Sequence, residues 1–159
     1  MSHRLRNVTR RSALGLAAAF LVLQQSPAEA ESPAILVHKD PNCSCCSGWV
    51  NHLKDAGFAV TVEETADLEP VSRRLGVPAD LAACHTAEVD GYVLEGHVPA
   101  TAVRRLLKER PAAIGLSVPG MPAGSPGMEG GTPRPYDVVL FGKTGRQPFM
   151  HFVGSENVG

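Results

Sequence analysis

Cysteine residues offer the most distinctive chemistry in this sequence. Three of the four stand together as Cys43-Ser44-Cys45-Cys46, and the fourth, Cys84, comes much later in the chain and is followed by His85. Thiolates act as nucleophiles in disulfide exchange and as ligands for soft metal ions. In an exported protein they also form structural disulfides. The residue types therefore leave three hypotheses open, which are a soft-metal site, redox exchange and plain disulfides.

The spacing of the cysteines favours the metal site. Only Cys43 and Cys46 have the C-x-x-C spacing of redox proteins, and a dithiol switch does not need the third thiol, Cys45, that lies between them. Structural zinc sites usually have two separated C-x-x-C pairs, which disfavours zinc here. Thiolates favour Cu(I) and can bridge ions, so the four cysteines are predicted to bind one or more Cu(I) ions.

Methionine and histidine residues supply further candidate ligands. Met121 and Met128 lie in a Gly/Pro-rich segment, where a thioether can be offered to Cu(I); the alternative is that they pin the segment to the core. His85, beside the fourth cysteine, is a candidate ligand or a group that orients one. Met150 and His151 are adjacent in a predicted strand and are weaker candidates, since Met150 equally suits the core.

The first thirty residues have the features of a secretory signal peptide. Arginines precede a short apolar stretch, 13–23, and Ala28-Glu29-Ala30 is a small-x-small cleavage site. Thr9-Arg10-Arg11-Ser12 resembles a twin-arginine signal, and a Sec signal that holds two arginines is the alternative. Residues 1–30 are therefore expected to be removed, which leaves a periplasmic domain of residues 31–159.

Charge and hydropathy exclude two classes of partner. The chain has 15 Lys and Arg against 16 Asp and Glu, so it lacks the basic excess of a nucleic-acid-binding protein. No apolar run reaches the roughly 20 residues of a transmembrane helix, so stable membrane insertion is not expected. We expect neither a nucleic acid nor a membrane as partner.

The periodicity of the mature chain predicts a β-α-β-α-β-β-α order. The expected elements are a strand at 34–38, a helix carrying Trp49 and ending near Gly57, a strand at 58–62, a helix capped by Asp67, a hairpin of 86–89 and 92–97 around Asp90-Gly91, and a helix that opens at Pro99 with His97 as a candidate cap. Residues 111–135 are expected to be a long loop. A terminal hairpin of 137–141 and 148–152 follows.

This order is the plan of a thioredoxin-like α/β fold with an added Gly/Pro/Met loop and a C-terminal β-hairpin. Its first two strands would be parallel, and the cysteine loop would lie at the carboxyl end of the first strand. Cys84 falls in the loop before the third strand, which faces the same edge of the sheet. The topology therefore predicts that all four thiols converge.

Five ordered blocks resemble the CopG-type periplasmic copper-resistance family. They are Asp40-Pro41-Asn42-Cys43-Ser44-Cys45-Cys46 with Trp49, Cys84-His85-Thr86-Ala87, Gly91-Tyr92-Val93, Glu95-Gly96-His97-Val98-Pro99, and the Gly/Pro/Met segment from Gly120 to Glu129. The resemblance implies a thioredoxin-like fold and a role in copper tolerance beside other copper-handling proteins. Carried over by position, Cys43, Cys45, Cys46 and Cys84 would be the thiolate ligands of copper.

The functional hypothesis is an exported protein that binds Cu(I) through cysteine thiolates. Because thiolates stabilise Cu(I) over Cu(II), a copper oxidoreductase or electron-transfer activity is a reasonable extension. One alternative is a thiol–disulfide oxidoreductase that uses Cys43 and Cys46, with Cys84 as the resolving thiol. Another is a passive chaperone that hands Cu(I) to a partner through the methionine segment. The sequence does not decide whether the protein is an enzyme.

Overall fold

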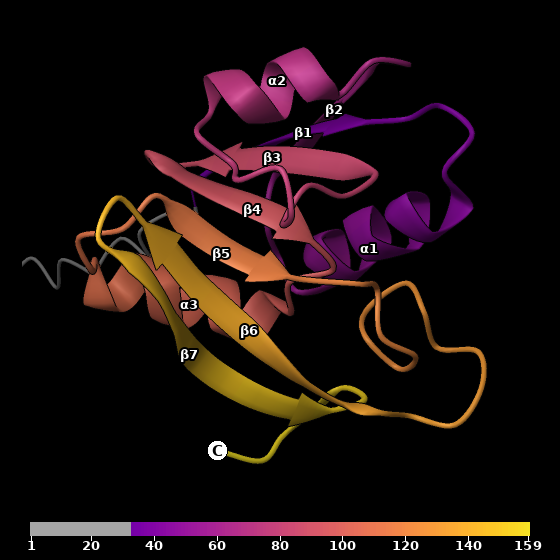
Figure 1. Cartoon of the computed structure of the whole chain (residues 1–159). Coiled ribbons are helices and arrows are strands. Elements are labelled where there is room, and N and C mark those ends of the chain that lie inside the picture. Colours follow the sequence, from indigo (N-terminus) through magenta and orange to yellow (C-terminus); the bar gives the residue numbers. More distant parts are fainter. Residues whose placement is uncertain (1–32) are drawn as a thin grey trace, which may run out of the picture. The chain divides into compact units, whose positions relative to one another are not determined.

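The fold is a single mixed sheet with three helices in a computed structural model that describes residues 33–159 (Figure 1). The predicted signal peptide, residues 1–30, lies outside the described residues. The elements in chain order are β1 (Ile35–Lys39), α1 (Ser44–Asp55), β2 (Val60–Glu64), α2 (Glu69–Arg74), β3 (His85–Val89), β4 (Tyr92–Gly96), α3 (Ala100–Glu109), β5 (Gly115–Val118), β6 (Pro135–Gly142), β7 (Gly145–Val153) and β8 (Glu156–Asn157).

The eight strands lie in the order β2-β1-β3-β4-β5-β6-β7-β8. β1 pairs in parallel with β2 and antiparallel with β3, and β3 pairs antiparallel with β4. The predicted α/β class, the element order as far as α3, the parallel pairing of the first two strands and the terminal hairpin of β6 and β7 are all confirmed.

The hairpin of β3 and β4 follows directly from its two turn residues. Asp90 and Gly91 both have positive φ angles, 47° and 83°. Two consecutive left-handed residues form the type I′ turn that matches the twist of paired strands, and Asp-Gly is a favoured pair for it. The turn pairs Val89 with Tyr92 and therefore sets the register in which β4 pairs with β3.

The expectations for β5 and for the start of α2 are wrong. Gly115–Val118 lies in the predicted loop 111–135 but forms β5, which is parallel to β4 and antiparallel to β6. All four residues of β5 are buried, so neither face gives an alternating pattern that sequence could reveal. Asp67 does not cap α2, because that helix begins at Glu69 after Leu68, without a side-chain cap.

Hydrophobic residues on the two faces of the sheet form two separate clusters. The larger one includes Trp49 and Leu53 of α1, Leu106 of α3 and Leu94 of β4. The smaller one joins Val77 and Leu81, after α2, to Val93 and Phe141. Neighbours such as Val93 and Leu94 point to opposite faces of a strand, so α1 and α3 cover one face and the segment after α2 covers the other. Figure 1 shows α3 passing behind β5 and β6.

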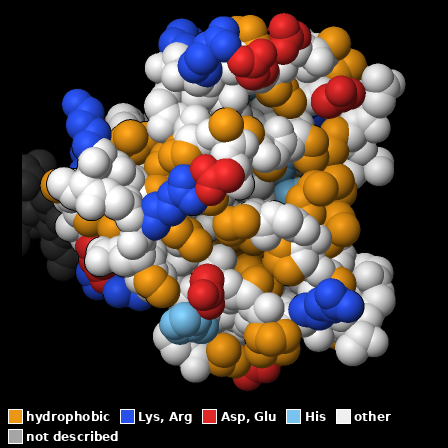
Figure 2. All heavy atoms as spheres, viewed as in Figure 1, with side chains coloured by type: hydrophobic (Ala, Val, Ile, Leu, Met, Phe, Trp, Pro, Cys, Tyr) orange, Lys and Arg blue, Asp and Glu red, His pale blue; other side chains and the backbone are white. Residues whose placement is uncertain are grey.

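The charged side chains on the surface are mixed in sign. On the face shown in Figure 2, Lys and Arg side chains alternate with Asp and Glu, without a large area of one sign. Arg146 pairs with Asp80, Arg110 with Asp90, and other exposed pairs lie along α2 and α3. Within the described part of the chain, no helix has the length and apolar character needed to cross a membrane.

Candidate metal centre

Strand pairing brings the two cysteine segments to one edge of the sheet. Lys39, the last residue of β1, lies opposite His85, the first residue of β3, in an antiparallel pair. The residues that follow β1 and the residue that precedes β3 are therefore neighbours. The backbone N–H of Asp40 donates a hydrogen bond to the carbonyl of Cys84 at 3.4 Å. Cys84 thus lies beside the cysteine loop, as the topology predicted.

The four cysteine sulfurs form one cluster. Cys84 Sγ lies 3.0 Å from Cys46 Sγ and 3.2 Å from Cys43 Sγ, and Cys45 Sγ lies 3.4 Å from Cys43 Sγ. All four sulfurs are within 4.8 Å of one another. Cys43 and Cys46 are joined by a disulfide, whereas Cys45 and Cys84 are free thiols. Cys46 is buried and the other three are half-buried, so the cluster opens to solvent on one side.

The start of α1 supports negative charge on these sulfurs. Cys43 is the N-cap residue of α1, and its Sγ accepts a hydrogen bond from the backbone N–H of Cys46 at 3.3 Å. The first turn of the helix holds no acidic residue. Because the amino end of a helix carries a partial positive charge, it stabilises thiolates placed there. A thiolate is the form of cysteine that binds metal ions.

Burial has the opposite effect on the fourth cysteine, Cys84, because it disfavours the thiolate form. Desolvation, followed by the negative charge of Cys45, raises the pKa of Cys84 to about 11 in the metal-free protein. A half-buried thiol with a pKa this high is neutral at neutral pH. A bound cation would reverse the preference, since it stabilises the thiolate directly. Cys84 is therefore suited to a metal and poorly suited to free nucleophilic attack.

His85 presents one ring nitrogen to the sulfur cluster. Its Nε2 lies 2.8 Å from the carbonyl oxygen of Gly96, and a carbonyl only accepts, so Nε2 carries the proton. Nδ1 therefore has a free lone pair, and it lies 3.2 Å from Cys46 Sγ and 4.0 Å from Cys84 Sγ. Burial, followed by the nearby His97, lowers the pKa of His85 to about 3, so the ring stays neutral. A neutral imidazole whose other nitrogen is anchored to a carbonyl is a typical metal ligand.

Two aromatic rings hold His85 in place. Trp49 of α1 stacks on it with ring centroids 4.4 Å apart, and the Trp49 indole N–H donates to the carbonyl of Val98 at 2.8 Å. The ring of His97 also stacks on His85, with ring centroids 5.3 Å apart. Trp49 and both histidines are fully buried. Trp49, which follows the cysteines by one helical turn, thus supports the imidazole ring from α1.

The remaining candidate ligands separate into two groups. Met121 is brought to the cluster, with its Sδ 3.7 Å from Cys84 Sγ, and its side chain is 38% exposed. Met128 lies in the same loop, but its thioether forms no comparable contact with a cysteine of the described chain. Met150 is buried in the larger hydrophobic cluster, and His151 is exposed and paired with Asp137. The structure therefore does not bring Met150 or His151 to the sulfurs.

The Gly/Pro-rich loop that carries Met121 is packed directly on α1. A Cβ atom at Gly127 would lie 2.4 Å from the carbonyl oxygen of Cys45 and 2.8 Å from the amide nitrogen of Trp49. A Cβ atom at Gly48 would lie 2.9 Å from the Cα of Gly127. The two glycines let the loop backbone touch the helix backbone beside the cysteines. This close approach places Met121 over the sulfur cluster.

The sequence did not mark His97 as a candidate site residue. It was a candidate cap for α3, but Pro99 is the N-cap residue and the first helical N–H, that of Ala100, bonds to Nε2 of His52 instead. His97 is fully buried, and one of its ring nitrogens lies within 4.8 Å of donor atoms of Cys84 and His85. The signal that could have revealed it is the hairpin register, which brings the end of β4 beside the start of β3.

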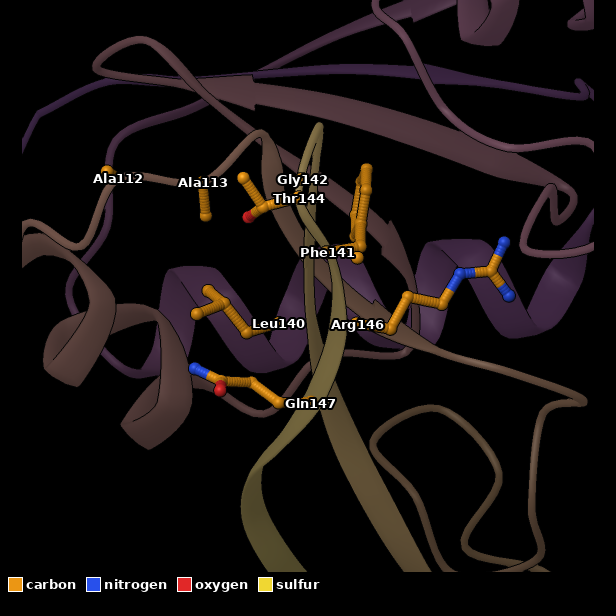
Figure 3. Close-up of a pocket in the computed structure, with 9 residues that line it drawn as sticks. Ala112, Ala113, Leu140, Phe141, Gly142, Thr144, Arg146 and Gln147 are labelled. Carbon is orange, nitrogen blue, oxygen red and sulfur yellow. The ribbon is translucent and has the colours of Figure 1, made fainter.

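A cavity at the turn between β6 and β7 is not part of this site. It has a volume of about 140 Å³ and lies against residues 140–142 and 144–147 and the segment that precedes β5 (Figure 3). No cysteine or histidine lines it, and its one charged residue, Arg146, is paired with Asp80. The residues capable of metal or redox chemistry lie at the start of α1 and of β3.

Comparisons with known proteins give one consistent result. A family described as "Protein of unknown function, DUF411" matches residues 81–128, which include Cys84, His85 and His97. The solved structure "Copper resistance protein copG- Form 1" is 45% identical, with a TM-score of 0.72, and the match covers 78% of this chain and all of that one. "Copper resistance protein copG- Form 2" is 44% identical, with a TM-score of 0.69, over 81% of this chain and all of that one.

No curated protein sequence matches this chain. The two solved structures are matched over their full length, at identities of 45% and 44%, which is enough to establish a shared family. The cysteine cluster that the sequence motif predicted is present in the fold. The chain belongs to the CopG copper-resistance family.

Proposed function

We propose that this protein is exported to the periplasm and binds Cu(I) there through the thiolates of its four cysteines. Residues 1–30 would act as the signal peptide, and the mature domain would serve copper resistance beside other copper-handling proteins. The proposal includes a thioredoxin-like fold, which the strand order β2-β1-β3-β4 with α1 and α3 on one face supports. It includes one or more copper ions as the cargo of the site.

The observation that carries the proposal is the convergence of the four sulfurs. A metal–sulfur bond is about 2.3 Å long, so two ligands of one ion lie at most about 4.6 Å apart. The sulfurs are within 4.8 Å of one another, so small movements bring several of them onto one ion. Thiolates, the thioether of Met121 and the neutral imidazole of His85 are all ligands that suit Cu(I).

Copper binding by all four cysteines requires that the disulfide be opened. Reduction of the Cys43–Cys46 bond consumes two electrons and two protons and yields two thiols. Each thiol then loses its proton as it binds the ion. The four-thiolate site is therefore available in the reduced protein only, and copper loading is expected to depend on the redox state of this pair.

Cys84→Ser is expected to lower the Cu(I) bound by the reduced protein to less than half of the wild-type stoichiometry. The serine hydroxyl is a hard donor and cannot replace the one sulfur that contacts Cys43 and Cys46 from the β3 side. Cys45→Ser is expected to have a similar effect. The measurement is anaerobic Cu(I) titration against a chromophoric chelator, with metal analysis and a free-thiol count.

The matched control is His151→Ala, which changes an exposed candidate ligand that lies outside the sulfur cluster. This variant should bind the full complement of Cu(I). Wild-type stoichiometry in Cys84→Ser would remove Cys84 from the site and defeat the multi-thiolate proposal.

A second candidate function is thiol–disulfide exchange, and one observation favours it. The disulfide joins the C-x-x-C pair, and Cys84 Sγ touches both of its sulfurs. A thiolate at Cys84 would attack the disulfide and form a mixed disulfide while one sulfur of the pair leaves as a thiolate. Against this, burial raises the pKa of Cys84 to about 11 and so leaves little thiolate at neutral pH.

Insulin reduction separates the two functions. If copper binding is the function, metal-free protein with a copper chelator should reduce insulin no faster than the dithiol reagent alone. A rate well above that background, lost in Cys43→Ser, would establish the oxidoreductase instead. Copper titration of the same samples reports the first function independently.

A further inference from the structure

We propose that His52 is a positioning residue that holds the junction of β4 and α3, residues 97–100, against α1 while its ring is neutral and releases the junction in acid. His52 lies in the last turn of α1, away from the cysteines at the start of that helix. It acts on the candidate metal centre through the junction. The contact belongs to the metal-free protein, and only its effect on copper rests on the proposed function.

The first support is a hydrogen bond that α3 does not supply for itself. The backbone N–H of Ala100, the first residue of α3, donates to Nε2 of His52 at 3.0 Å. The N-cap residue, Pro99, has no side-chain acceptor for the helix, and Ala100 is buried. A buried N–H at a helix start costs free energy when it has no partner. His52 therefore caps α3, although it belongs to another helix.

The second support is a matching contact one helical turn earlier on α1. The indole N–H of Trp49 donates to the carbonyl of Val98 at 2.8 Å. Residues three apart lie on the same face of a helix, so Trp49 and His52 hold the junction at two adjacent points. Trp49 also stacks on His85, with ring centroids 4.4 Å apart. A movement of the junction is therefore transmitted to the imidazole that faces the sulfurs.

The third support is that this contact exists only with a neutral ring. Because Nε2 accepts the Ala100 N–H, the ring proton is on Nδ1, and a second proton would set two donors against each other. The positive amino end of α3 also disfavours a charged ring. Burial lowers the pKa of His52 from 6.5 and outweighs the charges of Glu129, in the Gly/Pro-rich loop, and Asp55, on α1, which raise it. The unfolded chain thus takes up the proton first, and the free energy of unfolding falls as pH drops below 6.5.

The test compares wild type with His52→Gln, as oxidised and metal-free protein, between pH 7 and pH 4. Glutamine places an amide oxygen near the position of Nε2 and accepts the same N–H without titrating. In ¹⁵N-labelled wild type, NMR should detect the nitrogen–nitrogen coupling across the Ala100–His52 hydrogen bond at pH 7 and lose it in acid. The hydrogen-exchange protection of the Ala100 N–H should fall at least threefold over this range in wild type and stay constant in His52→Gln. The fluorescence of Trp49, the only tryptophan of the chain, should change with pH in wild type alone.

The matched control is His151→Gln, which removes an exposed histidine and should keep the acid response of wild type. Absence of the coupling at pH 7, or the same acid response in wild type and His52→Gln, would overturn the proposal.

The effect on the centre is measured as the Cu(I) affinity of the reduced proteins at pH 7 and pH 5. Protonation of the thiols weakens binding in both proteins, so the expected result is a loss at least threefold larger in wild type than in His52→Gln. Equal losses would overturn the positioning role. If neither protein bound Cu(I), the proposed function would fail, and the fluorescence of Trp49 would still decide whether the junction moves in acid.

Discussion

Replacing Glu95 with glutamine is expected to raise the free energy of unfolding of the metal-free protein at pH 8 and to change it little at pH 4. Glu95 lies in β4 and is fully buried, although it carries a carboxyl group. Its Oε1 accepts a hydrogen bond from the N–H of Ala83 at 2.6 Å. Its Oε2 has no partner within residues 33–159.

The neighbours of Glu95 do not neutralise a charge. Thr86 on β3 and Ser117 on β5 lie opposite it in the sheet, and both are fully buried with unpaired hydroxyls. Burial raises the pKa of Glu95 from 4.5 to about 7. A carboxyl group in such surroundings is protonated over most of the acidic range, and its ionisation disfavours the folded state.

The sign of the pH dependence follows from proton binding. Between pH 4.5 and 7 the folded protein keeps the proton that the unfolded chain has lost, so the free energy of unfolding falls as pH rises through this window. The stabilisation is fully present below 4.5 and lost above 7, and over the whole window it amounts to about 3 kcal/mol. Glutamine resembles the protonated acid and keeps an oxygen for the Ala83 N–H. The variant should therefore be more stable at pH 8 by up to about 3 kcal/mol.

Urea unfolding of oxidised, metal-free protein at several values between pH 4 and 8 measures this effect. Burial lowers the pKa of His52, His85 and His97, which gives the opposite slope, so the difference between wild type and variant isolates Glu95. The control is Glu69→Gln, at an exposed position on α2, which should leave the pH profile unchanged. Identical profiles for Glu95→Gln and wild type would contradict the prediction.

Local signals in the sequence were enough for much of the fold and for the cysteine cluster. Asp90-Gly91 determines its own turn, and the parallel β1–α1–β2 unit puts the cysteine loop at a strand end. Once β3 is placed beside β1, Cys84 must lie near that loop. These features depend on residue types at fixed spacing, which a single sequence displays.

The features that the sequence did not reveal depend on strands that are buried on both faces. Every residue of β4 and β5 is buried, so Glu95 and Ser117 show no alternation that would mark them as interior. β5 forms a strand because it pairs with β4 on one side and with β6 on the other. β6 is distant in the chain, since the long Gly/Pro-rich loop separates it from β5. The burial of His97 is likewise a consequence of tertiary packing around Trp49 and His85. The residue pattern of one segment does not show which distant segments pack against it.

Gly127→Ala is expected to lower the free energy of unfolding by about 2–4 kcal/mol and to expose Cys84, because the new methyl group meets backbone on both sides in a left-handed conformation. The φ angle of Gly127 is +86°, and its Cβ would lie 2.4 Å from the Cys45 carbonyl oxygen and 2.8 Å from the Trp49 nitrogen. Neither backbone atom can rotate away, so the loop must lift from α1.

The loop is expected to lift as a unit, since it is held together by its own hydrogen bonds. The N–H of Gly124 bonds to the Met128 carbonyl at 2.7 Å, and the N–H of Met128 bonds to the Ser125 carbonyl at 2.8 Å. The hydroxyl of Ser125 donates to the Pro122 carbonyl, directly after Met121. Movement at Gly127 therefore carries Met121 away from Cys84 Sγ and opens the sulfur cluster to solvent.

Two measurements check this prediction, with Gly130→Ala as the matched control. Gly130 lies in the same loop, and a Cβ there would meet nothing within 4 Å, so the control should change stability by less than about 0.5 kcal/mol. Urea unfolding gives the stability, and the rate at which a bulky disulfide reagent modifies Cys84 in the Cys45→Ser background gives its exposure. Faster modification in Gly127→Ala alone is expected because only that variant separates the loop from the cysteine helix. Equal rates and equal stability in both variants would mean that the loop does not depend on this contact, and the placement of Met121 over Cys84 would then need another cause.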